Sequence, residues 1–205
     1  QTNIDEMIMS ISTRLSEGYE AKRVPFDQLH LLATNNEYHW CSHHFQGDIR
    51  RAENALPLFN MLVLDIDGTM PLTVAQDLLK QYRAFFYTTK SHTEEVHRYR
   101  IILPINYEVE MEREEYNACM DAVLQTLPFE CDPATKDIAR KWMCNEGEYF
   151  YQEGELFDIL PFIPNTSRSD ERQQAFQNQS DLDNLERWVL NHTGAGNRND
   201  QIYKY

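Results

Sequence analysis

Two carboxylates separated by one residue, Asp65 and Asp67, are the side chains of this sequence best suited to chemistry. They follow the apolar run 61–64, and Gly68 comes directly after them. Such a run predicts a strand buried on both faces, and the glycine predicts its end. Because side chains alternate along a strand, both carboxylates should project from one face. Two negative charges this close raise each other's pKa unless a cation lies between them, and a divalent metal ion is the simplest such cation.

A polar segment rich in hydroxyls and cations, residues 88–98, is the second candidate for a functional role. Within it, Ser91 offers a hydroxyl and His92 an imidazole. The segment leads into a predicted strand over residues 99–103, which Pro104 is expected to close.

Arg98 and Arg100 stand two positions apart at the start of this strand and should therefore share one face. Two neighbouring guanidinium groups suit bidentate recognition of phosphate. The pattern indicates a binding surface for an anionic ligand next to the same sheet.

A third acid, Asp132, precedes another basic pair that includes Arg140. Pro133 favours extended backbone at Asp132 and disfavours helix there. Asp137 is an alternative third acid in the same segment.

Hydrophobic patterns predict the elements that must position these residues. Residues 3–17 carry apolar side chains at helical spacing and predict an amphipathic helix, with Asn3 as its N-cap. Residues 38–45 predict a strand. A capping box at residues 73–76 predicts the start of a helix, and residues 84–89 predict a buried strand, so that strand, helix and strand form a βαβ unit or its split variant.

Three further segments complete the predicted organisation. Residues 111–127 predict another amphipathic helix, and residues 148–159 a closing hairpin. We therefore expect a folded domain over residues 1–165, a polar linker over 166–180 and the start of a helical C-terminal region over 181–205.

Composition narrows the function classes. A chain of 205 residues has room for one well-filled domain. Its net charge of −14 argues against broad adhesion to nucleic acid but leaves room for a local basic groove. The sequence has no long apolar run and no basic-then-apolar leader, so we expect a cytoplasmic protein without a membrane partner. Its four cysteines show no C-x-x-C spacing and should stay reduced.

The order of these motifs resembles the catalytic core of the archaeo-eukaryotic primases (AEP), specifically the primase-polymerases of phages and plasmids. The resemblance spans roughly residues 35–165. That family opens with two acids flanking a hydrophobic residue, matched here by Asp65 and Asp67. Its third motif is an acid followed by a basic residue, matched by Asp132 and Arg140.

The second motif of that family is a Ser/His element that holds the phosphates of the incoming nucleotide, and Ser91 with His92 resembles it. The family usually places one residue between the serine and the histidine, whereas these two are adjacent. His97, Arg98 or Arg100 is therefore an alternative for the histidine's role.

The resemblance implies an α+β fold: an AEP-type core with an RRM-like mixed or antiparallel sheet flanked by helices, plus a short C-terminal helical segment. It implies a nucleotidyltransferase, a DNA primase and polymerase that adds nucleotides to a 3′-hydroxyl on single-stranded DNA. Two Mg²⁺ or Mn²⁺ ions would lie on Asp65, Asp67 and Asp132. The implied partners are a DNA template, a primer strand, NTP or dNTP, and a helicase domain in a longer chain, in phage or plasmid replication in the host cytoplasm.

Two other interpretations remain open. The string Asp-x-Asp-Gly-Thr also opens the haloacid dehalogenase phosphatases, which would make Asp65 a nucleophile and Asp67 an acid/base. That reading needs a Ser or Thr at the end of a second strand, which Thr88 or Thr89 could supply, and then a basic residue, which Lys90 or Lys141 could supply. However, no late acidic pair follows Lys141. The other alternative is a noncatalytic nucleic-acid-binding domain of a replication protein.

Some residues have two possible roles. Arg50 and Arg51 are adjacent, so at most one should serve the acidic site. Cys41, His43 and His44 could supply zinc ligands, but a half-buried strand is the favoured interpretation because no second pair has the right spacing. Three aromatic residues could stack on a base, although core packing is favoured: Phe45, Tyr87 and Trp142.

Overall fold

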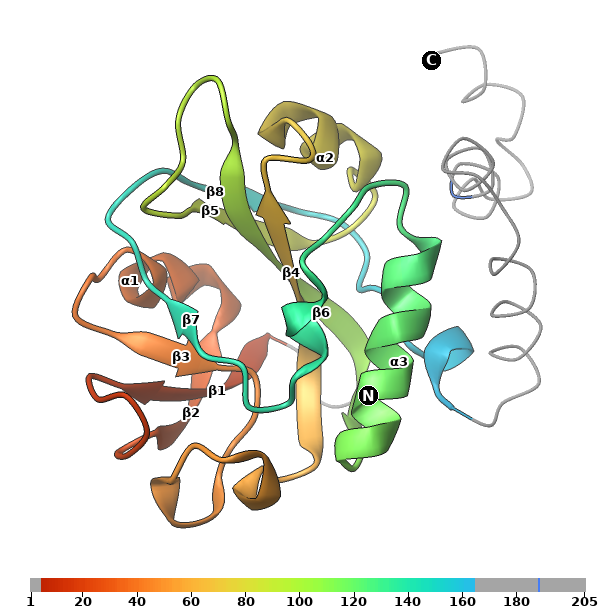
Figure 1. The fold of residues 1–205 in the computed structure, drawn as a ribbon. Helices are drawn as coiled ribbons and strands as arrows, with labels where there is room; N and C mark the ends of the chain where they lie inside the picture. Colours follow the sequence, from red (N-terminus) through yellow and green to blue (C-terminus); the bar gives the residue numbers. More distant parts are fainter. Residues whose placement is uncertain (1–4, 165–187, 189–205) are drawn as a thin grey trace.

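A computed structural model describes residues 5–164 and Trp188, and these residues form two four-stranded sheets with three α-helices (Figure 1). The first sheet has the strand order β2-β1-β3-β7 and the second β4-β6-β5-β8, with every pair of neighbours antiparallel.

The first sheet consists of β1 (Glu6–Ser12), β2 (Glu20–Pro25), β3 (His39–Cys41) and β7 (Trp142–Met143). The second consists of β4 (Leu58–Asp67), β5 (Ala84–Thr88), β6 (Arg98–Glu110) and β8 (Tyr149–Gln152). The helices are α1 (Leu29–Ala33), α2 (Leu72–Leu78) and α3 (Arg113–Thr126). The predicted α+β class is confirmed.

The N-terminal segment forms β1 and not the predicted helix. Met7, Ile8 and Met9 are buried in succession, which a strand between two layers allows and a one-sided amphipathic helix does not. Leu15, counted as part of the helical stripe, is exposed. The helical prediction was wrong because pairing with β2 and β3, distant in sequence, decides the conformation here.

Strand β4 is the buried strand that the sequence predicted, with the side chains of residues 61–64 almost fully shielded from solvent. Strand β6 lies between β4 and β5 and is antiparallel to both. The unit β4–α2–β5 is therefore the split variant of βαβ. Its central strand, β6, also runs on past the point where Pro104 was expected to end it. The ladder between β4 and β6 shifts register near Pro104, and at such an irregularity a residue without an N–H is tolerated.

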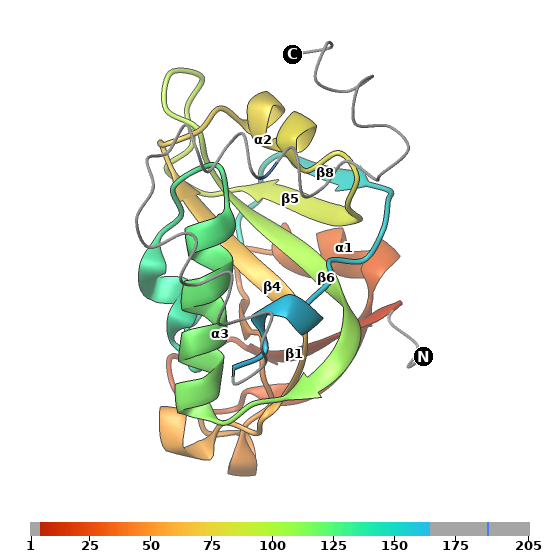
Figure 2. The same ribbon diagram turned by 90° about the vertical axis from the view of Figure 1, so that its right-hand side faces the viewer.

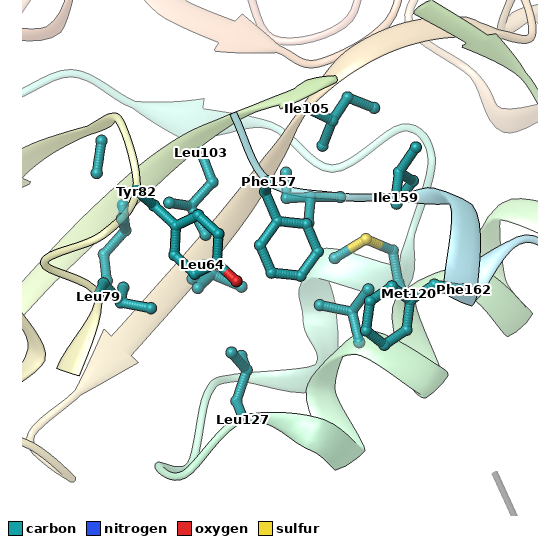
Figure 3. Close-up of a cluster of buried hydrophobic side chains, with 14 of the residues drawn as sticks. Leu64, Leu79, Tyr82, Leu103, Ile105, Met120, Leu127, Phe157, Ile159 and Phe162 are labelled. Atoms are coloured by element: carbon teal, nitrogen blue, oxygen red, sulfur yellow. The ribbon is translucent and has the colours of Figure 1, made fainter. Parts of the chain in front are cut away.

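The two faces of the second sheet are both covered. Helices α2 and α3 lie over one face, where Figure 2 shows α3 running along β4 and β6. Leu64 and Leu103 of the sheet pack there with Met120 of α3 and with Phe157 (Figure 3). This cluster fixes one side of β4 and leaves its other side facing the first sheet.

The opposite face packs against the first sheet and α1. Val63, Tyr87 and Ile102 meet Met9 and Trp40 in a second apolar cluster. Where β4 ends and β6 begins, charged residues replace the apolar side chains of this layer. The edge of the apolar layer is therefore a suitable place for a functional site.

Other predicted elements were partly correct. Helix α3 begins and ends within two residues of its predicted bounds, whereas α2 begins at Leu72 after Pro71, so the capping box at residues 73–76 does not form. Strand β8 pairs with β5, so the closing hairpin was wrong: Phe157 instead bridges Ile105 in parallel. The predicted linker and C-terminal helical region lie outside the described residues. Within the described part, the helices are too short or too polar to cross a membrane.

Candidate functional site

The two acids of β4 face the two arginines of β6 across the sheet. Asp65 pairs in register with Arg100, and Asp67 with Arg98, so the predicted common face of each pair is realised. Arg100 Nε lies 3.3 Å from Asp65 Oδ1, and Arg98 Nε donates to Asp67 Oδ1. The sequence predicted both pairs of residues but missed that they neutralise each other.

A tight turn follows the acids. Gly68 adopts φ +79°, a left-handed conformation, and its N–H donates to the carbonyl oxygen of His97 over 2.9 Å. A Cβ atom at this position would lie only 2.9 Å from Val96 Cγ1. Both the backbone angle and the close approach therefore require glycine here.

Asp132 is brought beside Asp65 by backbone pairing. Its N–H donates to the Asp65 carbonyl oxygen at 2.8 Å, and its carboxylate accepts the N–H of Ala134 at 2.8 Å, which caps a 3₁₀ turn over Pro133–Lys136. The hydroxyl of Thr135 donates to the Val63 carbonyl oxygen and ties this turn to β4. Asp132 is therefore the third acid nearest to the pair on β4.

The alternative acid, Asp137, faces elsewhere. Its carboxylate accepts the N–H of Ala139 at 3.0 Å, and its charge acts on Cys41 and Tyr116. The charge that raises the pKa of Asp65 from the same segment is that of Asp132.

The surroundings of Asp65 raise the pKa of its carboxyl group. Burial raises the pKa of its carboxyl group, Arg100 and Arg140 lower it, and the negative charges of Asp132 and Asp67 raise it. Burial is the largest of these effects, so Asp65 lies in a partly dehydrated environment where charges interact strongly.

Trp142 lies between two of the cations. The guanidinium carbons of Arg100 and Arg140 are 5.1 Å and 5.3 Å from its ring centre, within the range of cation–π contact. The Nε atoms of both arginines are buried and donate no hydrogen bond, although Arg100 Nε stays within ion-pair distance of Asp65. Trp142 itself is buried, as are Phe45 and Tyr87, so these aromatic rings pack in the core and are not available for a base.

The segment between β5 and β6 holds Ser91 and two histidines. His97 uses both ring nitrogens: Nδ1 accepts the N–H of Leu72 at 2.9 Å, and Nε2 lies 3.2 Å from the Glu94 carbonyl oxygen. The hydrogen-bond pattern therefore assigns a proton to His97 Nε2 and gives this residue a structural role. His92 accepts the N–H of Arg98 on Nδ1 at 3.1 Å, which leaves its Nε2–H as a donor towards a ligand.

Other candidates lie away from the acids. Arg50 donates to the carbonyl oxygens of Leu15 and Ala139, and Arg51 is exposed, so neither forms an ion pair with the acids in the described structure. His43 is buried between the rings of Phe59 and Tyr116. It belongs to the core but not to the predicted half-buried strand, because β3 ends at Cys41 and all three of its residues are buried.

The carboxylates fit Mg²⁺ or Mn²⁺ in their chemistry, because these ions prefer oxygen ligands. Their arrangement is incomplete. In the described part of the chain no three His, Cys, Asp or Glu side chains converge as a metal site. Each carboxylate of β4 has an arginine on one of its oxygens: Arg98 lies on Oδ1 of Asp67, and Arg100 on Oδ1 of Asp65.

Comparisons with known proteins bear on the family of the chain. Among solved structures, the AEP domain of the cyanophage S-2L primase-polymerase (PrimPol) matches with 11% identity and a TM-score of 0.45, over 85% of this chain and 90% of that chain. Values this low establish neither a shared activity nor shared site residues. No curated protein matches. The family model of the VapE N-terminal domain matches residues 41–156, which include all the candidate site residues and more than half of the chain. The chain belongs to the VapE N-terminal domain family.

Proposed function

We propose that residues 1–165 form the catalytic domain of a DNA primase-polymerase, a nucleotidyltransferase that extends a 3′-hydroxyl on a single-stranded DNA template. The observation that carries the proposal is the meeting of three acids and three arginines at one end of β4 and β6. The acids are Asp65, Asp67 and Asp132, and the arginines are Arg98, Arg100 and Arg140. Such a site needs no protein nucleophile, because transfer of a nucleotidyl group depends mainly on positioning and charge.

The acids have the role of metal ligands in this proposal. Two Mg²⁺ or Mn²⁺ ions would lower the pKa of the attacking 3′-hydroxyl and neutralise the departing pyrophosphate. The partial burial of Asp65 supports this role, since a carboxylate that loses solvation gains more from a bound cation than an exposed one does.

The basic residues would bind the triphosphate of the incoming NTP or dNTP. Arg140 carries a buried Nε–H without a hydrogen-bond partner, which is a reason to expect an anionic ligand near it. The free Nε2–H of His92 would donate to the same phosphates. The basic surface is local, in keeping with a net charge of −14 that favours short-range contacts over general DNA adhesion.

The phosphatase alternative has less support. Its Asp-x-Asp motif belongs to open parallel sheets with a switch point, whereas the neighbour of β4 is antiparallel. Two threonines could bind its phosphate. Thr88 is buried and its hydroxyl accepts the N–H of Glu148, whereas the Thr89 hydroxyl donates to the Arg98 carbonyl oxygen at 3.4 Å. A noncatalytic nucleic-acid-binding domain is the remaining alternative, and the arginines that occupy the acids are the observation in its favour.

Primer extension on single-stranded DNA tests the proposal. The assay supplies a labelled primer, Mg²⁺ or Mn²⁺, and NTP or dNTP in separate reactions, and a parallel reaction omits the primer. We expect metal-dependent incorporation by the wild type and none by the double variant Asp65→Asn, Asp67→Asn. The matched control is Asp137→Asn, which removes an acid of the same region that faces away from Asp65.

The outcomes separate the three functions. Incorporation by the double variant, with its fold verified by circular dichroism, would contradict the assignment of these acids. Absence of incorporation by the wild type, together with DNA binding, would favour the noncatalytic alternative. Release of phosphate from small phosphomonoesters would favour the phosphatase.

A further inference from the structure

The two arginines that face the acids are held very differently. Arg100 has an exposed side-chain fraction of only 12%. Its NH1 group donates to the Met143 carbonyl oxygen at 2.7 Å and to the Tyr87 hydroxyl at 3.2 Å, and its guanidinium lies over Trp142. Moving this side chain would break all of these contacts at once.

Arg98 is held by far less. Its side chain is 38% exposed, and that of its partner Asp67 is 67% exposed. Besides the contact with Asp67, its NH1 group donates to the Ser91 carbonyl oxygen at 3.0 Å. Exposed ion pairs of this kind contribute little to stability, so a stronger anion can replace the carboxylate.

The backbone at Arg98 stays fixed independently of its side chain. Its N–H donates to His92 Nδ1, and its carbonyl oxygen accepts the N–H of Thr89 at 2.9 Å. A change of partner therefore needs only rotation of the side chain, with no movement of β6.

Resting on the proposed function, we propose that Arg98 exchanges Asp67 for a phosphate of the incoming triphosphate, while Arg100 remains on Asp65 as a fixed positioning residue. The exchange releases the Asp67 carboxylate to join Asp65 and Asp132 around a divalent ion. In the described part of the chain, no three acids converge as a metal site while Arg98 lies on Asp67, which is in keeping with this exchange. Triphosphate and metal must then favour each other's binding, because coupling between two ligands is reciprocal.

The first test follows the arginines directly by NMR. The Nε–Hε signals of Arg98 and Arg100 are recorded in EDTA, before and after addition of inorganic tripolyphosphate or a nonhydrolysable dNTP analogue. We expect the Arg98 signal to shift and the Arg100 signal to stay in place. Equal shifts of both signals, or no shift of Arg98, would overturn the exchange.

The second test measures the affinity for Mn²⁺ alone by electron paramagnetic resonance. Arg98→Gln should bind Mn²⁺ more tightly than the wild type, on the order of fivefold, which corresponds to the loss of one surface ion pair. The matched control is Lys90→Gln, which makes the same change of net charge in the adjacent exposed segment without contacting Asp67. A gain in Lys90→Gln equal to that in Arg98→Gln, or no gain in Arg98→Gln, would refute the proposal.

Failure here is distinguishable from failure of the proposed function. If the wild type incorporates nucleotides but its Arg98 Nε–Hε signal does not shift, the polymerase assignment stands and the proposed exchange is wrong. If the wild type neither incorporates nucleotides nor binds Mn²⁺, both the polymerase assignment and the proposed exchange are wrong.

Discussion

Asp65 and Arg100 occupy directly paired positions on β4 and β6, and Arg100 Nε lies 3.3 Å from Asp65 Oδ1. Both side chains are largely shielded from solvent, with exposed fractions of 12% for Arg100 and 14% for Asp65. Burial raises the pKa of Asp65, and Arg100 provides the strongest opposing effect. The same contact that keeps this acid charged inside the protein therefore supports both the fold and the candidate site.

Arg100→Gln should lower the free energy of unfolding by about 3 kcal/mol at pH 7, because it leaves the Asp65 carboxylate buried and unpaired. Urea unfolding measures this value. Arg98→Gln is the control and should cost less than about 1 kcal/mol, since the pair that it breaks is exposed. Similar losses in the two variants would contradict the contrast between the buried pair and the exposed one.

Asp132→Asn should reduce nucleotide incorporation at least about a hundredfold, since it removes one charge that a divalent ion would need beside Asp65. Asp137→Asn should retain most of the activity, because its carboxylate caps the backbone near Ala139. Both variants are compared by single-turnover incorporation with saturating Mn²⁺. The reverse order of effects would make Asp137 the third ligand.

His92→Asn should raise the KM for the nucleotide about tenfold while the protein keeps its stability. The asparagine can still accept the N–H of Arg98, but it lacks the outward Nε2–H of the imidazole.

His97→Ala is the counterpart, and it should lower the free energy of unfolding by about 1 kcal/mol by leaving the Leu72 N–H without its acceptor. Its KM should change little. Steady-state kinetics and urea unfolding of both variants measure the two quantities, and a larger KM effect in His97→Ala would reverse the roles of the histidines.

The protein should lose stability in mild acid through His43. Burial lowers the pKa of His43 from 6.5 to about 3, so the folded state keeps this ring neutral while the unfolded state takes up a proton below pH 6.5. Stability is therefore lost as the pH falls from about 6.5 towards 3, and the loss at pH 5 should be about 2 kcal/mol.

His43→Gln removes the titrating group and should make unfolding less dependent on pH between 5 and 7. His44→Gln, a change at the partly exposed neighbour, serves as the control. Urea titrations at several pH values give the slopes, and an unchanged slope in His43→Gln would assign the acid sensitivity to other groups, among them His39, whose pKa burial also lowers.

Local patterns predicted the faces of the site strands correctly. The alternation of side chains put Asp65 with Asp67, and Arg98 with Arg100, because each pair lies within one strand. The length of the buried run at residues 61–64 likewise predicted β4, since continuous apolar sequence suits a strand covered on both sides.

Local sequence patterns could not predict which distant segments contact each other. The register of β4 against β6 decides that each acid meets an arginine, and register depends on the whole sheet rather than on either strand alone. The N-terminal strand was mistaken for a helix for the same reason, because β2 and β3 supply its partners. The choice of Asp132 over Asp137 as the neighbour of Asp65 also depends on a nonlocal backbone bond, from the Asp132 N–H to Asp65.

The left-handed turn at Gly68 has a consequence for recognising such proteins from short strings. A chain that leaves a buried strand directly after two acids and must fold back beneath Val96 accepts only glycine at that point, whatever reaction follows. The letters Asp-x-Asp-Gly can thus arise in unrelated proteins from backbone geometry alone. Proteins that match this tetrapeptide should therefore be sorted by the strand next to the two acids. In this protein that strand, β6, runs antiparallel and carries arginines opposite the acids.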